Sequence, residues 1–111
     1  MPTIFEPKDL PVTELKGLKI TMLANSAMLG TNALQVEHIT LMAGEGSPSY
    51  EAIDAERFLY VIRGAGNVCV GESAHSLSAE SVLWLEQGDV FYLEAGAHGL
   101  EVLYCRAPSG E

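Results

Sequence analysis

The sequence predicts a single all-β domain, a barrel or a sandwich, of 111 residues. Short runs of β-branched, aromatic and aliphatic residues recur along the chain, and turn-forming residues separate them. Helical periodicity is weak throughout. A chain of this length can bury a core of its own, although small domains gain stability from oligomerisation.

The expected strands are the apolar or alternating runs, and the expected turns are the segments rich in Gly, Pro, Ser or Asp. The strands cover residues 18–23, 34–41, 58–62, 67–70, 82–85, 90–93 and 100–104. The turns cover residues 44–48, 63–66, 71–73, 87–89 and 95–99. We expect an extended N-terminal arm over 1–12, a barrel over 13–108 and a short tail over 109–111.

Charge and composition exclude several classes of partner. Fifteen acidic residues against six basic ones give a formal net charge of −9, which repels nucleic acids and anionic membrane surfaces. No apolar run approaches the roughly 20 residues that span a bilayer, and the N-terminus has no apolar signal core. Cys69 and Cys105 lie in apolar runs, as free buried cysteines do, and this usage fits a cytoplasmic protein.

The run 58–62, Phe-Leu-Tyr-Val-Ile, is apolar on both faces of the expected strand. If one face lines the inside of the protein, the other must be covered by something else. A second copy of the chain is the simplest cover, because an exposed aromatic face favours aggregation. The sequence therefore predicts a homodimer.

Gly44, Tyr50, Ala52, Arg57 and Gly64 recur at characteristic intervals along one stretch of the chain. Their spacing resembles the first motif of the cupin superfamily. Tyr50 and Ala52 stand at the positions of two metal-binding histidines, and Arg57 stands at the position of a metal-binding glutamate. The residues that normally hold the metal are thus replaced.

A second stretch is similar to the other cupin motif. Glu80, Gly88, Phe91 and Ala95 keep its spacing, with Phe91 at the third histidine position. In this register, 90–93 and 100–104 form a hairpin with 95–99 as its turn. A competing register begins at Gly88 and makes His98 the surviving ligand.

The resemblance implies a double-stranded β-helix, also called a jelly-roll barrel, which is usually dimeric. The superfamily includes dioxygenases, isomerases, epimerases, cyclases, sugar-binding modules and sensors, so the fold alone selects no function.

A metal site or other cofactor is not expected at the motif positions. Only the Tyr50 phenol can ligate a metal there, and the permanent charge of Arg57 repels one. An atypical metal site stays open as an alternative. Its candidate ligands are Glu51, Asp54, Glu56, His38 and His98.

The expected interior suits a small organic ligand. If Arg57 points inward, strand alternation also points Leu59 and Val61 inward, with Phe91 and Leu93 facing them. Arg57 would bind a carboxylate or phosphate, and Tyr50 would donate a hydrogen bond. The candidate ligand-binding residues are Tyr50, Arg57, Phe91, Trp84 and His38.

Each candidate also has a purely structural interpretation. Arg57 can pair with Glu51, Asp54 or Glu56, because a buried guanidinium needs a partner. Phe91 can be core packing, and Trp84 can serve the core or a dimer interface. His38 can be a surface or satisfied core residue, while His75 and His98 are expected in exposed turns.

The sequence therefore favours a metal-free cupin that binds a small acidic or sugar-like molecule without catalysis, as a binding or sensory protein. Two enzyme classes remain as alternatives. One is a metal-independent isomerase, epimerase or cyclase that uses His38, Tyr50 or Glu51. The other is a metal-dependent dioxygenase or isomerase with atypical ligands. No catalytic residue is assigned, because no Ser-His-Asp or Cys-His arrangement is visible.

Overall fold

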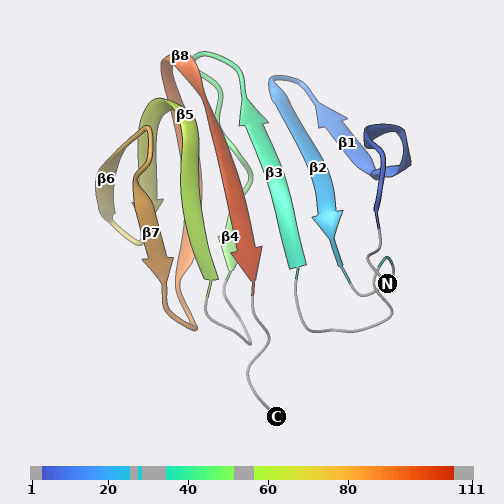
Figure 1. The fold of residues 1–111 in the computed structure, drawn as a ribbon. Coiled ribbons are helices and arrows are strands. Elements are labelled where there is room, and N and C mark those ends of the chain that lie inside the picture. Colours follow the sequence, from blue (N-terminus) through green and yellow to red (C-terminus); the bar gives the residue numbers. More distant parts are fainter. Residues whose placement is uncertain (1–3, 26–27, 29–34, 52–56, 107–111) are drawn as a thin grey trace.

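A computed structural model describes residues 4–25, 28, 35–51 and 57–106, and it confirms the all-β prediction. The described residues form antiparallel strands and a short 3-10 helix near the N-terminus (Figure 1). The elements are η1 (Pro7–Asp9), β1 (Val12–Leu15), β2 (Leu18–Ala24), β3 (Gln35–Leu41), β4 (Tyr50–Glu51), β5 (Arg57–Val70), β6 (Ser73–Ser78), β7 (Val82–Leu85) and β8 (Val90–Arg106). No helix in these described segments is long and apolar enough to cross a membrane.

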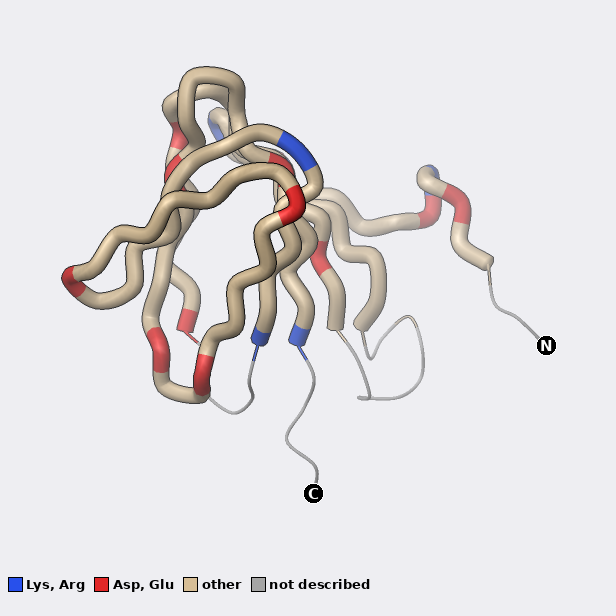
Figure 2. Tube along the Cα trace, turned by 60° about the vertical axis from the view of Figure 1, so that its left-hand side comes forward, with Lys and Arg blue, Asp and Glu red and all other residues tan. Residues whose placement is uncertain are grey.

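The two longest strands, β5 and β8, organise the fold. The strand order is β1-β2-β3-β8-β5-β6, with β4 paired to β8 and β7 paired to β5. β5 and β8 pair from Arg57 opposite Arg106 to Val70 opposite Phe91. One half of this pair joins β3 and β7, and the other half joins β4 and β6. The sheet therefore folds into two layers that face each other (Figure 2).

The glycine-rich segments 63–66 and 95–99 were predicted as turns, and this prediction is wrong. They lie within the continuous strands β5 and β8, so the expected hairpin between 90–93 and 100–104 does not form. The register shifts next to Val61 and around Gly64, where φ is 90°, and such β-bulges bend a strand without ending it. A Cβ on Gly66 would lie 2.1 Å from the carbonyl oxygen of Glu94. Glycine is required there because β5 and β8 approach so closely.

Other strands follow the sequence pattern to different degrees. β2, β3 and β7 lie where the apolar runs predicted strands, and the bounds of β7 are those expected. β1, β4 and β6 were not predicted, because none of them carries an apolar run. His75 lies in β6 and His98 in β8, so both are exposed strand residues and not turn residues.

The core fills the space between the two layers. Leu59, Val61, Phe91 and Leu93, which the sequence placed on the inside, are all at most 1 % exposed. Fully burying a side chain of this size contributes about 1.5 to 3 kcal/mol. The other buried core residues are Leu18, Ile39, Leu41, Val68, Leu77, Leu85, Leu100, Val102 and Tyr104.

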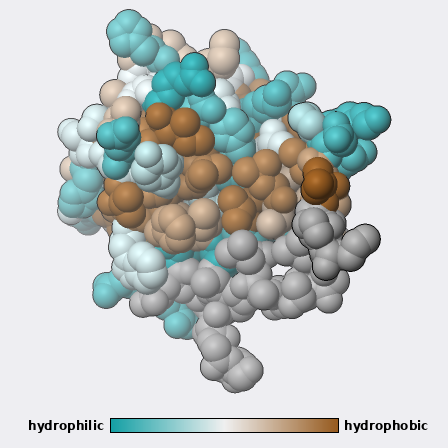
Figure 3. Space-filling model, in the orientation of Figure 1, coloured by the Kyte–Doolittle hydropathy of each residue, from teal (hydrophilic) through white to brown (hydrophobic). Residues whose placement is uncertain are grey.

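A second apolar surface covers the outside of the layer that contains β3, β7 and their partners. We call it the outer apolar face and define it by Phe58, Tyr60, Val82, Trp84 and Leu103. The registers place these side chains beside one another, and the Phe58 and Trp84 rings stack at 6.3 Å with an interplanar angle of 5°. Figure 3 shows apolar side chains gathered on this side of the molecule.

Candidate functional site

The strand registers align polar side chains in two rows at one end of the barrel. Antiparallel partners lie on the same face of a sheet, so each row shares the orientation of its buried members. Leu59 and Leu85 are at most 1 % exposed, which identifies this face as the inner one. The outermost row contains Gln35, Arg106, Arg57 and Leu85, and the next contains Glu37, Tyr104, Leu59 and Leu83.

Three aromatic rings connect the two layers below these rows. Tyr50 of β4 pairs with Phe91 of β8, and their rings stack with centroids 5.3 Å apart. Tyr104, from the opposite layer, lies 5.2 Å from Tyr50 and meets Phe91 edge-on at 5.6 Å. Aromatic pairs in these geometries attract each other beyond their burial. We call this group the aromatic trio.

Hydrogen bonds link the polar residues above the trio. Arg57 Nη1 donates to the Tyr104 hydroxyl oxygen at 2.7 Å, and its guanidinium carbon lies 5.7 Å from the centre of that ring. Gln35 Nε2 donates to Glu37 Oε2 at 3.5 Å, and Arg106 Nη1 donates to Gln35 Oε1 at 3.4 Å. These five residues, together with the neighbouring Tyr50, form what we call the mouth cluster: Gln35, Glu37, Tyr50, Arg57, Tyr104 and Arg106.

Two polar atoms of the mouth cluster are buried without a partner among the described residues. They are Glu37 Oε1 and the Tyr50 hydroxyl oxygen. A buried polar group left unsatisfied costs about 1 to 3 kcal/mol. Such atoms in a native structure call for a specific reason, and a bound molecule is one.

The pKa values in the mouth cluster reflect this burial. Burial raises the pKa of Glu37, and the hydrogen bond from Gln35 and the charge of Arg57 offset only part of this effect. Burial, with smaller contributions from Glu37 and Tyr104, raises the pKa of Tyr50 to about 12. The pKa of Tyr104 is also raised by burial, although Arg57 opposes the shift. Tyr50 is therefore a neutral hydrogen-bond donor at physiological pH.

The structure brings together three of the five predicted ligand-binding residues, namely Tyr50, Arg57 and Phe91. It contradicts an interior role for the other two. Trp84 is 58 % exposed and stacks on Phe58 in the outer apolar face. His38 Nε2 lies 2.6 Å from Glu101 Oε2, a carboxylate that also pairs with Arg63 on the outside of the sheet.

The physical reason is strand alternation. His38 has the opposite parity to Ile39 and Leu41, which are both 1 % exposed, so its side chain points outward. The same rule places Glu37 inward. Sequence reasoning missed Glu37 and Tyr104, although their parity with buried neighbours was a signal that could have found both.

The carboxylates expected to pair with Arg57 are only partly described. Glu51 is exposed at the end of β4. Asp54 and Glu56 lie outside the described residues, as does Ala52. Glu37, from a strand distant in the sequence, supplies a carboxylate that interacts electrostatically with Arg57.

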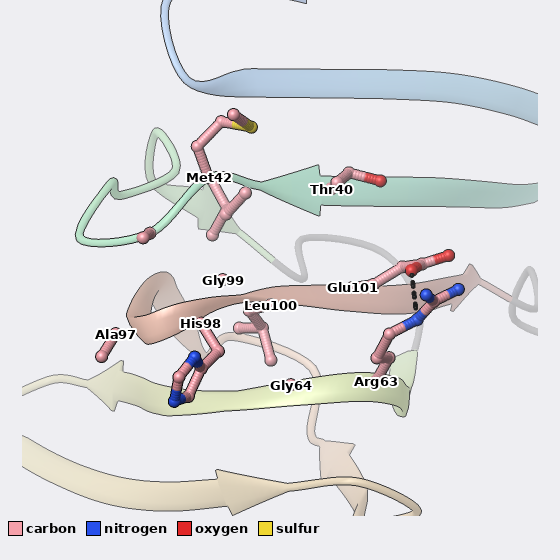
Figure 4. A pocket seen from close by; sticks show the side chains of 11 residues that line it. Thr40, Met42, Arg63, Gly64, Ala97, His98, Gly99, Leu100 and Glu101 are labelled. Carbon is pink, nitrogen blue, oxygen red and sulfur yellow. Dashed lines mark ion pairs between the residues drawn. The ribbon is translucent and has the colours of Figure 1, made fainter.

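The geometry favours the register that assigns Phe91 to the third histidine position. Tyr50 and Phe91 stack on each other inside the barrel, as two residues at ligand positions should. His98 lies instead on a surface pocket of about 360 Å³, which it shares with Met42, Arg63 and Glu101. Figure 4 shows His98 and Arg63 toward opposite ends of that pocket.

The donor set of the mouth cluster does not fit the metal ion typical of cupin enzymes. Among the residues with described positions, no three His, Cys, Asp or Glu side chains gather closely enough to hold a metal ion. The cluster offers one carboxylate, beside two phenols with raised pKa values and two permanent cations, Arg57 and Arg106. We therefore derive no chemistry through a metal.

Comparisons with known proteins identify the fold. No protein-family model matches the sequence, and no curated protein matches it. Three similar solved structures are a cupin domain of Schizosaccharomyces pombe Cnp3, an RmlC-like cupin from Shewanella frigidimarina and a predicted oxalate decarboxylase from Thermotoga maritima.

The TM-scores of these structures are 0.76, 0.76 and 0.78, and their sequence identities to this chain are 13 %, 17 % and 15 %. The matches cover 95 %, 100 % and 96 % of this chain and 73 %, 95 % and 100 % of the three others. This chain therefore has the cupin fold, an all-β jelly-roll barrel, and the fold implied by the sequence resemblance is confirmed. Identities this low carry the fold and not the activity.

Proposed function

We propose that this protein binds a small polar organic molecule at the mouth cluster, without a metal ion and without chemical change of the ligand. The observation that carries the proposal is a pair of buried polar atoms, Glu37 Oε1 and the Tyr50 hydroxyl oxygen, which have no hydrogen-bond partner in the part of the chain that the structure describes. A ligand with complementary groups would satisfy both and offset the cost of burying them.

Arg57 and the aromatic trio supply the other features of a ligand site. The guanidinium has five donors in a planar fork that matches an anionic group such as a carboxylate. Its bond to Tyr104 and its position over that ring hold it in one orientation. The trio gives the ligand an apolar surface to pack against.

Mass spectrometry of small molecules released from denatured protein tests the proposal. We expect the purified wild-type protein to release a bound molecule and the Arg57→Leu variant to release at least tenfold less. Arg63→Leu is the matched control, because Arg63 is 79 % exposed on the outer side and should keep the ligand. Circular dichroism shows whether each variant is folded. Equal release from Arg57→Leu and wild type would contradict the role given to Arg57.

A metal-independent enzyme is the second candidate function, and one observation favours it. Glu37 is a half-buried carboxyl group with a raised pKa in a cluster with two tyrosines, an environment suited to proton transfer. Incubating the protein and its released molecule in D₂O discriminates the two functions. Deuterium at a carbon position of the ligand would favour the enzyme, and an unchanged mass would favour binding alone.

We also propose that a second copy of this chain covers the outer apolar face. The face is continuous across three strands, and its stacked Phe58–Trp84 pair presents a large aromatic surface to solvent. An apolar patch of this kind is typical of an interface, and a two-fold axis through it would bury the patch of both copies.

Light scattering coupled to size-exclusion chromatography tests the dimer. We expect twice the chain mass of 11.9 kDa for wild type and a monomer for Trp84→Glu. Val90→Glu is the control, because Val90 is 47 % exposed but lies on β8 opposite β4, away from this face. A wild-type monomer would refute the proposal.

Free thiols at Cys69 and Cys105 agree with a cytoplasmic setting for the assembly.

A further inference from the structure

The outer side of the sheet changes from apolar to charged along the strands β5 and β8. The outer apolar face ends with the row in which Tyr60 stands opposite Leu103. In the next outward row, Arg63 of β5 stands opposite Glu101 of β8. Figure 3 shows hydrophilic side chains above the apolar ones on this side of the molecule. A partner that covers this surface must therefore match both parts.

The charged row is already organised within one copy of the chain. Arg63 Nε lies 3.2 Å from Glu101 Oε1, the pair that Figure 4 marks with a dashed line, and His38 Nε2 lies 2.6 Å from Glu101 Oε2. The Arg63 side chain is nevertheless 79 % exposed. A guanidinium has five donors in a planar fork. Its Nη donors can therefore reach a second carboxylate that approaches from outside.

The separation of apolar and charged rows limits the direction of a two-fold axis. Two sheets that pack face to face keep their strands roughly aligned, so the axis runs either along the strands or across them. An axis across the strands would set the charged row of each copy on the apolar rows of the other, or leave the apolar rows uncovered. Burying charge against an apolar surface is costly. An axis along the strands sets like rows on like rows and avoids this cost.

The charges then select the position of the axis within the outer apolar face. An axis over β5 would place the Arg63 guanidiniums of both copies against each other, and an axis over β8 would do the same to the Glu101 carboxylates. Like charges repel at these distances. An axis between β5 and β8 instead sets Arg63 of each copy opposite Glu101 of the other. The same axis sets Tyr60 of each copy opposite Leu103 of the other, so apolar side chains also meet.

We propose that two copies of this chain associate about a two-fold axis between β5 and β8, with Arg63 of each copy paired to Glu101 of the other. This inference rests on the proposed dimer and gives its geometry. Each Glu101 then lies between its own Arg63 and that of the second copy. Four alternating charges form a closed ring at one end of the apolar contact, and such polar contacts fix the register of an interface.

Two charge-reversed variants test the pairing by competition. Arg63→Glu places two carboxylates per copy at the ring, and Glu101→Arg places two guanidiniums there. Each variant alone should dimerise about tenfold more weakly than wild type, because both pairs between the copies become repulsive. When the two variants are mixed, mixed dimers should predominate, since every pair between the copies is again opposite in charge. Native mass spectrometry separates the three kinds of dimer by mass.

A control pair carries the same charge changes away from the ring. Lys8→Glu lies in η1, and Glu72→Arg lies in the exposed turn after β5. Mixing these two variants should give the statistical proportion of mixed dimers. An effect of net charge alone would appear in the control pair as well.

A second measurement uses Arg63 alone, in case Glu101→Arg does not fold by circular dichroism. Arg63→Gln removes the attraction without adding repulsion, so its dissociation constant from sedimentation equilibrium should lie between those of wild type and Arg63→Glu. The differences should shrink in 1 M salt, where the screening length falls to about 3 Å.

The contrary outcomes separate this inference from the proposed dimer. A wild-type monomer would overturn both. A wild-type dimer whose charge-reversed variants mix in statistical proportion, or whose Arg63→Glu variant dimerises as tightly as wild type, would overturn the position of the axis while the dimer stands.

Discussion

Replacing the half-buried carboxylate of the mouth cluster by its amide, Glu37→Gln, should stabilise the ligand-free protein at neutral pH. The substitution keeps the shape of the side chain and removes the charge. Burial raises the pKa of Glu37 by more than Gln35 and Arg57 lower it, so the folded state disfavours the ionised form. Loss of that charge should therefore increase the free energy of unfolding.

The expected gain follows from the cost of keeping a negative charge in a half-buried site, which the neutral amide avoids. Solvent screens part of this cost, because the side chain is only partly buried. We expect a net stabilisation of about 1 kcal/mol, which raises the melting temperature by about 4 °C in a domain of this size.

The stability difference between Glu37→Gln and the wild type should change with pH in a defined direction. Because the pKa of Glu37 is raised in the folded state, the folded protein binds this proton more tightly than the unfolded chain does. The stability that this proton contributes is fully present below the ordinary value of 4.5 and is lost as the pH rises through the folded-state pKa. The advantage of Glu37→Gln should thus be absent at acidic pH and grow toward neutral pH.

Urea unfolding of both proteins at a series of pH values between about 4 and 8 measures this difference. Glu14→Gln, an exposed change of the same type, controls for the loss of one charge from an acidic protein. The reasoning is refuted if Glu37→Gln is no more stable than wild type at pH 8, or if its advantage does not depend on pH.

Urea unfolding also tests two predictions about the barrel. Phe91→Ala should lower the free energy of unfolding by about 3 to 5 kcal/mol, because it removes the centre of the aromatic trio. Tyr92→Ala, on the exposed face of the same strand, should lower it by less than about 1 kcal/mol. Equal losses would mean that Phe91 does not belong to the core. Gly66→Ala should cost more than Gly46→Ala, because its Cβ would clash with the Glu94 carbonyl oxygen, whereas the nearest atom to a Cβ on Gly46 lies 3.4 Å away. A Gly66→Ala variant as stable as Gly46→Ala would mean that β5 and β8 are free to separate locally.

The sequence predicted most strands because their signal is local. The run 82–85 is apolar and lies between a serine-rich turn and a Gly-Asp turn, and β7 has those bounds. The segments 63–66 and 95–99 have turn composition, yet they bend strands that continue through them. Glycine supplies a bulge or a close strand approach as readily as a turn, and composition alone does not distinguish these uses.

Only part of the candidate site could be predicted from the sequence, for a related reason. Tyr50, Arg57 and Phe91 came from motif spacing, which records positions around a barrel. Glu37 and Tyr104 lie outside the motifs, and only the pairing of β3 with β8 brings them together. That pairing joins segments more than sixty residues apart, and a one-residue slip would have turned both side chains outward.

The shared strands β5 and β8 have a consequence for how this molecule opens. Each belongs to both layers, so neither layer can peel away without breaking the central ladder from Arg57 to Val70. Amide hydrogens on that ladder should exchange only when the whole domain unfolds, while β1 and β6, each paired on one side, fray first. Release of the proposed ligand should therefore require only local motions at the open end of the barrel, while the β5–β8 ladder stays intact.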